Sequence, residues 1–194
     1  MRLFVALDVP EESRERLRGV IAQLKPECPH ARWVRPEGIH ITLKFIGDVA
    51  PEKLDAIVGA LALVYGDGGS GAMQPVEIRF RGIGFFPNER RPRVLWCGVA
   101  ASPYLAQIAR DIERALEPLG IESESRAYTP HLTLARSQQP QDFERLARAS
   151  AGDLAQRDLG TARETAFHLF ESFLKPTGAE YKRLRTFPFA TDAA

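Results

Sequence analysis

Polar and apolar residues alternate in two matching tetrapeptides, His-Ile-Thr-Leu at 40–43 and His-Leu-Thr-Leu at 131–134. This alternation has the period of a half-buried strand, so it predicts one strand around each motif. In each strand the histidine and the threonine share one face, and the two apolar residues share the other. Two such strands facing each other would place two acid–base groups and two hydroxyl donors around a small anion, as phosphoryl chemistry without a metal requires.

The pattern recurs along the chain with the spacing of these two histidines, 131 − 40 = 91. A shift of 91 residues carries the apolar strand pattern at 2–6 onto 93–97, and the pattern at 76–80 onto 167–171. Helical periodicity marks two further pairs of segments, 11–24 with 103–116 and 51–64 with 141–150. Each half therefore predicts strand, helix, His-x-Thr strand, helix and strand. We infer an internal duplication, with repeats of approximately 1–91 and 92–194, inside a single domain spanning residues 1–194.

Composition narrows the class of protein only slightly. The 194 residues are 44% hydrophobic and 26% charged with a net charge of +1, which is ordinary for a soluble globular protein. No apolar run is long enough to span a bilayer, and the N-terminal segment predicts a strand instead of a signal peptide. Two cysteines, Cys28 and Cys97, do not make a disulfide framework. We expect a cytoplasmic protein with no membrane partner, and we take it to be a monomer.

The sequence lacks the motifs of several other sites. No histidine has a second ligand at helical spacing or in a Cys-x-x-Cys array, so we expect no metal and no other cofactor. No Gly-x-Ser-x-Gly elbow supports a serine nucleophile. The glycine-rich segment 66–72 predicts a flexible loop and lacks the Gly-Lys-Ser/Thr of a phosphate-binding loop. Arginines cluster at 79–93 and could form a basic rim for a phosphate backbone, although the balancing acidic residues favour solvated surface for most of them.

The surroundings of the two motifs carry a family resemblance. The stretches that carry it are Arg2-Leu-Phe-Val-Ala-Leu-Asp, Trp33-Val, His40-Ile-Thr-Leu-Lys-Phe-Ile-Gly, Gly82-Ile-Gly-Phe-Phe-Pro, Thr129-Pro-His-Leu-Thr-Leu-Ala-Arg, Phe170-Glu-Ser-Phe-Leu and Gly178-Ala-Glu-Tyr. In these the chain resembles the two-histidine phosphoesterase superfamily and, within it, the RNA 2',3'-cyclic phosphodiesterases, also called 2'-5' RNA ligases. One His-x-Thr motif is a weak signal, whereas the pair in these surroundings is a strong one.

The resemblance implies an α+β fold of two lobes. Each lobe is expected to be an antiparallel sheet with helices outside, and the lobes are expected to be related by a pseudo-twofold axis. The internal duplication independently predicts the same arrangement. The histidines would then face each other across a central cleft, where the two halves meet.

The resemblance also implies hydrolysis of 2',3'-cyclic phosphates on RNA ends or nucleotides to 2'-phosphates. One imidazole must start neutral and the other protonated, and an unperturbed pKa of about 6.5 allows both forms near neutrality. By resemblance, His40 is the acid that protonates the leaving 3' oxygen and His131 is the base that activates water, although the motif itself is symmetric. Thr42 and Thr133 are expected to donate hydrogen bonds to the non-bridging oxygens.

Phe45 and Arg136 each follow a motif histidine by five residues. The family uses these positions for the substrate, with an aromatic ring beside the base or ribose and an arginine on the phosphate. An odd offset points a side chain to the opposite face of an ideal strand, so both strands must end, bulge or twist first. Phe45 is equally well interpreted as a core residue. For Arg136 we favour phosphate binding, because the cleft has no other obvious cation.

Two other functions stay open. One is an ATP-independent RNA ligase that forms 2'-5' linkages, and the other is a non-catalytic RNA-binding module of the same fold. The intact motifs argue against the module, and nothing in the sequence separates hydrolase from ligase. We expect His30 and His168 to be structural or surface residues.

Overall fold

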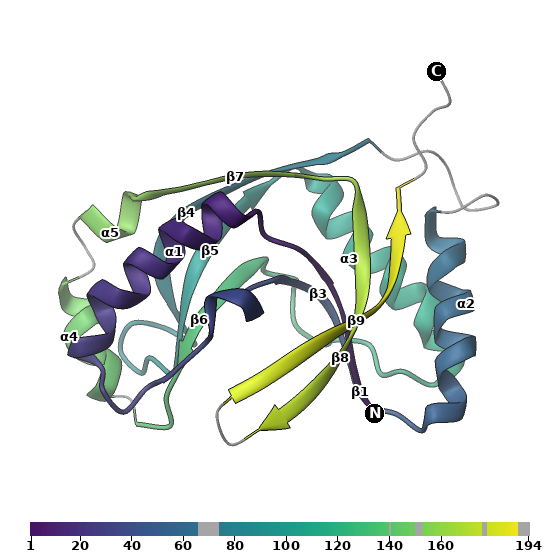
Figure 1. The fold of residues 1–194 in the computed structure, drawn as a ribbon, viewed down its shortest axis with the longest axis horizontal. Helices are drawn as coiled ribbons and strands as arrows, with labels where there is room; N and C mark the ends of the chain where they lie inside the picture. The colour runs from purple at the N-terminus through teal and green to yellow at the C-terminus, as the bar shows by residue number, and fades with distance from the viewer. Residues whose placement is uncertain (66–73, 140, 150–152, 176–177, 190–194) are drawn as a thin grey trace.

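The computed structural model describes residues 1–65, 74–139, 141–149, 153–175 and 178–189, and the predicted loop at 66–72 lies outside them. The chain has the predicted α+β class of fold, and its strands form a curled antiparallel sheet (Figure 1). Its strands are β1 (Arg2–Leu7), β2 (Arg32–Trp33), β3 (Ile41–Asp48), β4 (Val76–Phe86), β5 (Val94–Ala101), β6 (His131–Arg136), β7 (Asp158–Glu164), β8 (Ala166–Lys175) and β9 (Gly178–Pro188). Its helices are α1 (Glu11–Leu24), α2 (Leu54–Tyr65), α3 (Pro103–Leu116), α4 (Gln141–Ala149) and α5 (Asp153–Gln156).

The described strands form one sheet in the order β7-β4-β5-β6-β3-β1-β8-β9, with the short β2 paired to β6. The sequence predicted two separate sheets, so this is a difference. The two halves are continuous because one antiparallel residue pair, Ile41 with Leu132, joins β3 to β6. Beyond that pair, β2 lies along β6, with Arg32 opposite Arg136.

The sheet order is symmetric about the β3–β6 junction. Outward from it, β3-β1-β8-β9 corresponds to β6-β5-β4-β7. Ala6 of β1 pairs with Thr42, and Trp96 of β5 pairs with Thr133. Equivalent residues of β1 and β5 are therefore 96 − 6 = 90 residues apart, and not 91 as inferred from the sequence. The third strand predicted for each half pairs with a strand of the other half. β4, from the first half, pairs with β5, and β8, from the second half, pairs with β1.

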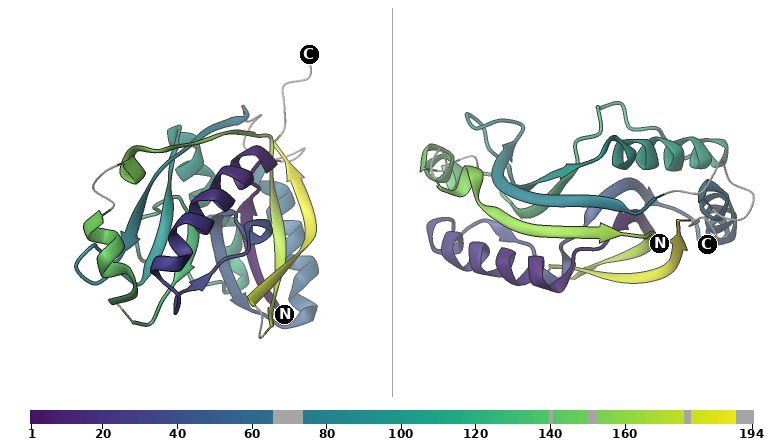
Figure 2. Two further views of the ribbon diagram at one scale, coloured as in Figure 1. Left: turned by 60° about the vertical axis from the view of Figure 1, so that its left-hand side comes forward. Right: turned by 90° about the horizontal axis from the view of Figure 1, so that it is seen from above.

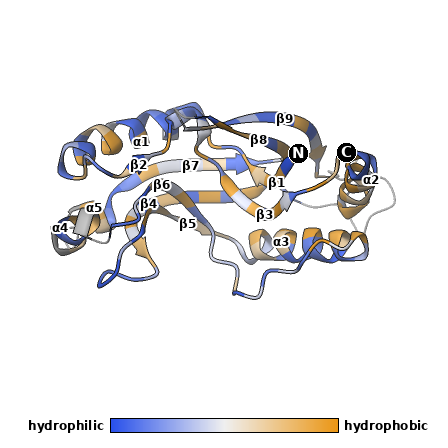
Figure 3. Cartoon of the chain, turned by 90° about the horizontal axis from the view of Figure 1, so that it is seen from below, coloured by the Kyte–Doolittle hydropathy of each residue, from blue (hydrophilic) through white to orange (hydrophobic). Residues whose placement is uncertain are grey.

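The helical periodicity located the helices closely. The segments predicted at 11–24 and 103–116 are α1 and α3, and the segment at 51–64 begins with the 3-10 turn Pro51–Lys53 before α2. In α1 and α3 the predicted apolar stripes are buried: Leu17, Val20, Ile21 and Leu24, and Leu105, Ile108, Ile112 and Leu116. Figures 1 and 2 show α2 beside α3 at one end of the sheet, with α1, α4 and α5 toward the other. Figure 3 shows the mixture of hydrophobic and hydrophilic positions along α3 that such one-sided burial produces.

Both cysteines, Cys28 and Cys97, are buried free thiols. None of the described helices combines the length and the apolar composition needed to cross a membrane.

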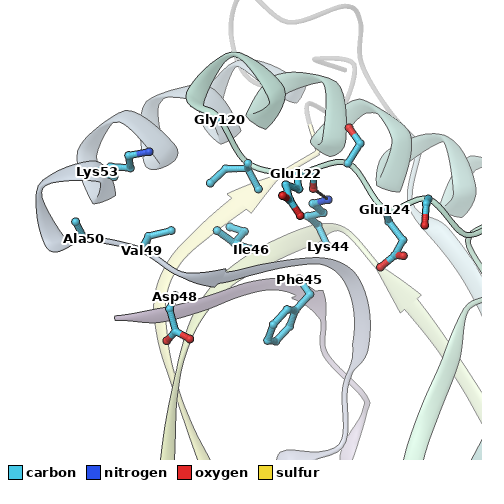
Figure 4. A pocket seen from close by; sticks show the side chains of 13 residues that line it. Lys44, Phe45, Ile46, Asp48, Val49, Ala50, Lys53, Gly120, Glu122 and Glu124 are labelled. Atoms are coloured by element: carbon cyan, nitrogen blue, oxygen red, sulfur yellow. Dashed lines mark hydrogen bonds between the residues drawn. The ribbon is translucent and has the colours of Figure 1, made fainter.

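A buried ion pair connects the sheet to α3. The Lys44 side chain on β3 is 4% exposed, and its Nζ donates to Glu113 Oε1 at 2.5 Å and to the Glu122 carbonyl oxygen at 2.6 Å. The Glu113 carboxylate is 24% exposed and also accepts the backbone N–H of Glu124 at 2.8 Å. Figure 4 shows Lys44 pointing from β3 toward the segment that carries Glu122 and Glu124. The pair therefore holds β3 against the chain that follows α3.

We expect the two members of this pair to contribute unequally to stability. Glu113→Ala leaves a buried ammonium group without its counter-ion, and should lower the free energy of unfolding by about 3 kcal/mol. Lys44→Met keeps the buried methylene volume and leaves a carboxylate that water can reach, so its loss should stay below about 1.5 kcal/mol. Urea denaturation of both variants measures the difference. An equal or larger loss for Lys44→Met would contradict the buried-charge argument.

Candidate active site

The two His-x-Thr motifs meet where β3 and β6 join in the middle of the sheet. His40 immediately precedes β3, and His131 is the first residue of β6. The residue that follows each histidine belongs to the pair that joins the strands, Ile41 with Leu132. Neighbours of an antiparallel pair point to the opposite face, so both histidines lie on the face away from that pair. In this register His40 lies toward Thr133, and His131 lies toward Thr42.

β3 bulges just beyond its threonine. The pairing of β3 with β1 shifts by one residue between Thr42 and Lys44, so Leu43 is an extra residue. One extra residue in a strand moves the side chains that follow it to the opposite face from the one they would have in a regular strand. Phe45 therefore returns to the side of His40 and Thr42 despite its odd offset, and Figure 4 shows it on the opposite side of β3 from Lys44.

β6 bulges at the equivalent position. Its pairing with β5 shifts between Thr133 and Ala135, so Leu134 is the extra residue. Arg136 returns to the side of His131 and Thr133, and its guanidinium lies 3.4 Å from Thr133 Oγ1. The irregularity that the odd offset required is thus confirmed in both strands.

A groove of about 1070 Å³ lies over this face of the sheet. Among the predicted site residues, it is lined by His40, Thr42, Phe45, Thr133 and Arg136. His131 lies beside the groove, outside its lining, with its ring edge-on to Phe86 at a centroid distance of 4.9 Å. His131 is still near enough to help lower the pKa of His40.

Both imidazoles are held by the same backbone contact. His40 Nδ1 lies 2.8 Å from the carbonyl oxygen of Gly38, and His131 Nδ1 lies 2.8 Å from that of Thr129. A carbonyl oxygen can only accept a hydrogen bond, so each Nδ1 carries the proton. In the neutral rings Nε2 is then the atom that can accept a proton, and in the charged rings it is the atom that can donate one.

Aromatic rings pack around the histidines. Phe4 lies against His40 at a centroid distance of 4.6 Å, and Tyr181 meets it edge-on at 5.1 Å. Phe86 takes the corresponding place at His131. Tyr181 also lines the groove. Sequence reasoning missed the contacts of Phe4 and Phe86, because they depend on pairing between distant strands.

The surroundings lower the pKa of both imidazoles. Burial lowers the pKa of His40 to about 4, opposed by the Gly38 carbonyl and by Asp8, and the positive charge of Arg136 lowers it further. Burial also lowers the pKa of His131, the Thr129 carbonyl opposes this, and Arg136 adds to it. Both pKa values lie below the ordinary 6.5, so the neutral form of each ring is favoured at pH 7, and one ring must gain a proton if it is to act as an acid.

Phe45 and Arg136 are both accessible to a ligand. Phe45 is 48% exposed, so its interpretation as a core residue is wrong. The guanidinium of Arg2 lies 5.0 Å from the centre of the Phe45 ring, which is a cation–π distance. Arg136 is exposed and forms no ion pair with a described carboxylate.

The other two histidines, His168 and His30, do not belong to the His-x-Thr motifs. His168 is 5% exposed, with Nδ1 3.0 Å from Thr186 Oγ1, so it is a structural histidine as predicted. His30 is exposed and lines the rim of the groove. Across the described part of the chain, no three His, Cys, Asp or Glu residues come together in an arrangement that could hold a metal ion.

A second, smaller pocket of about 550 Å³ lies between β3 and residues 120–125 (Figure 4). No histidine lines it, and its central cation, Lys44, is already paired with Glu113. Of the predicted site residues only Phe45 lines this pocket, so the two His-x-Thr motifs lie outside it.

The chain is similar to known proteins over nearly its whole length. The model of the family described as LigT-like phosphoesterase matches residues 7–96 and 99–181. An RNA 2',3'-cyclic phosphodiesterase of Archaeoglobus fulgidus is 34% identical over 192 residues, which cover 96% of this chain and 99% of the relative. The crystal structure of TT0787 of Thermus thermophilus superposes with a TM-score of 0.80 at 28% identity and covers all of both chains. The structure of Escherichia coli LigT complexed with 3'-AMP gives a TM-score of 0.74 at 25% identity and covers 97% of each chain.

The exposure of Phe45 predicts how the protein tolerates its truncation. Phe45→Ala should change the melting temperature by no more than about 2 °C, because surface substitutions stay within about 0.5 kcal/mol. Phe80→Ala is the matched control, since Phe80 is fully buried and its loss should lower stability by about 3–5 kcal/mol. Thermal melts compare the two variants. A loss at Phe45 similar to that at Phe80 would mean that the ring supports the fold.

Proposed function

The chain belongs to the LigT-like phosphoesterase family, and we propose that it hydrolyses the 2',3'-cyclic phosphates of RNA ends and nucleotides to 2'-phosphates. The observation that carries the proposal is the pair of imidazoles on one face of the sheet, each with Nδ1 on a backbone carbonyl and Nε2 left for proton transfer. The relatives named RNA 2',3'-cyclic phosphodiesterase match over nearly their whole length, which supports this substrate class.

In the proposed reaction the cyclic phosphate lies between the two motifs. The hydroxyls of Thr42 and Thr133 donate hydrogen bonds to the non-bridging oxygens, and Arg136 neutralises their charge. Nε2 of His131 takes a proton from water as the oxygen attacks phosphorus, and Nε2–H of His40 gives a proton to the departing 3' oxygen. This assignment of acid and base follows the family resemblance.

Substrate binding supplies the protonation state that the free site lacks. The neutral form of each ring is favoured in the ligand-free protein because burial and Arg136 disfavour their charged forms. A phosphate anion placed against Nε2 has the opposite effect, since a nearby negative charge favours the imidazolium. We infer that one proton binds together with the substrate. The acid is then charged only when a phosphate is present.

We further propose that the two halves arose by duplication and share a pseudo-twofold axis, with the groove as a central cleft between them. The symmetric order of strands about the β3–β6 junction supports this. The bulges at Leu43 and Leu134 also support it, because they are 134 − 43 = 91 residues apart, like the histidines. The cytoplasmic location and the monomeric state stay predictions.

A direct assay tests the proposed function. The protein is incubated with a nucleoside 2',3'-cyclic phosphate in excess chelator, and the position of the phosphate in the product is identified. Release of the 2'-phosphate under these conditions supports the proposal. Absence of turnover, or turnover that only an added metal restores, contradicts it. Addition of an RNA with a 5'-hydroxyl to the same assay tests for the 2'-5' ligase reaction.

We expect His40→Ala and His131→Ala each to lower kcat/KM by at least about a hundredfold, because each removes a general acid or base. The double variant should be little worse than either single variant, since the two groups act as one unit. Single-turnover rates with a cyclic mononucleotide measure all three. Near-normal turnover in either single variant would exclude the two-histidine mechanism.

The pH dependence should reflect the lowered pKa values. The profile of kcat/KM reports the free enzyme, in which one ring must be neutral and the other charged. Both pKa values lie below the ordinary 6.5, so the bell should have its maximum on the acidic side of pH 6.5. The profile of kcat should be displaced to higher pH, because bound phosphate favours the imidazolium. A flat profile, or a kcat/KM maximum above neutrality, would contradict the desolvated pair.

A further inference from the structure

The lining of the groove has an unbalanced charge. The whole chain carries 26 basic and 25 acidic residues, so its surface is nearly neutral on average. Among the described residues, in contrast, the groove lining contains six arginines and lysines and no aspartate or glutamate: Arg2, Arg32, Arg35, Arg93, Arg136 and Lys175. A cyclic phosphate carries one negative charge, so the terminal group alone does not account for this concentration of cations.

Part of this charge is already neutralised. Arg35 and Lys175 both form ion pairs with Glu180, at 3.6 Å and 2.5 Å. Arg2 stacks on the ring of Phe45. The other three arginines form no ion pair with any described carboxylate, and all three are exposed: Arg32, Arg93 and Arg136.

These three residues, which we call the arginine row, have neighbouring backbones at one end of β6: Arg32 on β2, Arg136 on β6, and Arg93 just before β5. Arg32 on β2 is directly opposite Arg136 on β6, and Arg136 is opposite Val94 at the start of β5. Arg93 precedes Val94, and its carbonyl oxygen accepts the backbone N–H of Ser137 at 2.9 Å. Neighbouring strands are about 5 Å apart, so the backbones of the row span roughly 10 Å.

The directly opposite pair Arg32 and Arg136 is unfavourable without an anion. Like charges directly opposite each other on paired strands destabilise a sheet. Arg136 is beside Thr133, which places it at the phosphate of the proposed reaction. Arg32 and Arg93 flank it, so they remain available for a second negative group next to the first. The Trp33 ring, whose Nε1 donates to the Cys28 carbonyl at 3.2 Å, lines the same groove. Cations interleaved with aromatic rings are typical of sites for single-stranded nucleic acid.

We propose that Arg32 and Arg93 bind the phosphodiester that joins the terminal nucleotide of an RNA to the nucleotide before it. The protein then selects RNA chains ending in a cyclic phosphate over cyclic mononucleotides. This inference rests on the proposed function, because it places the cyclic phosphate at the two histidines. It adds a binding site and two specificity-determining residues to that reaction.

The test compares three substrates: a nucleoside 2',3'-cyclic phosphate, the same compound with a 5'-phosphate, and a short RNA ending in the cyclic phosphate. The quantity measured is the ratio of kcat/KM for each longer substrate to that for the first. For the unaltered protein we expect both ratios to exceed one. Arg32→Ala and Arg93→Ala should each lower them by about tenfold, the effect of losing one charge-assisted hydrogen bond to phosphate. Melting temperatures verify that the variants are folded.

Arg90→Ala is the charge-matched control, because Arg90 is exposed on the turn between β4 and β5 and does not line the groove. It should leave the ratios unchanged. Salt dependence gives a second measurement. The logarithm of kcat/KM for the RNA should fall with the logarithm of salt concentration, and each variant of the row should flatten this slope by about 0.7.

The outcomes separate the two levels of the argument. Failure of the unaltered protein to cleave any of the three substrates would overturn the proposed function itself. Cleavage of all three with equal kcat/KM would leave that function intact and overturn the second phosphate site. An equal effect of Arg90→Ala would overturn it as well, because the preference would then reflect overall charge. A fall in all three rates without a change in ratio would place Arg32 and Arg93 at the cyclic phosphate and not beyond it.

Discussion

The antiparallel pair of Ile41 with Leu132 is the contact on which the site depends. It joins the two halves of the sheet, and it lies one residue after each motif histidine. Because a backbone pair fixes both the distance and the direction of two strands, the separation of the imidazoles is set by the sheet and not by side-chain flexibility. Rigid placement of this kind gives two proton-transfer groups a fixed geometry before a substrate arrives.

The bulges at Leu43 and Leu134 decide what else reaches the substrate. In two regular strands Phe45 and Arg136 would point into the core, where burial of an unpaired guanidinium is strongly unfavourable. The extra residue in each strand turns both side chains back to the face of the histidines. At the same time it lets Lys44 face inward, where Glu113 and the Glu122 carbonyl satisfy its charge. One backbone irregularity thus supplies a site residue and an anchor for the helix behind the sheet.

The electrostatics of the groove follow from this packing. Aromatic rings and buried backbone desolvate the imidazoles, and Arg136 adds a positive charge nearby, so both effects lower the pKa of the histidines. The described residues of the groove lining include cations but no carboxylates, and a phosphate complements such a surface. An anion bound there offsets the charge of the arginines and favours protonation of one ring. In the proposed reaction, the same field that attracts the substrate makes catalysis dependent on its arrival.

The sequence by itself determined the local elements and the residues at the centre of the site. Strict alternation identified the two His-x-Thr strands, and the 3.6-residue periodicity located the helices at 11–24 and 103–116, because both patterns reflect which side of one element is buried. The tertiary structure alone decided the continuity of the sheet, the exchange of β4 and β8 between the halves, the exposure of Phe45 and the lowered pKa of the histidines. These properties depend on pairing between residues far apart in the chain. Leu43 is an extra residue only relative to β1, and Arg32 lies beside Arg136 only because β2 pairs with β6.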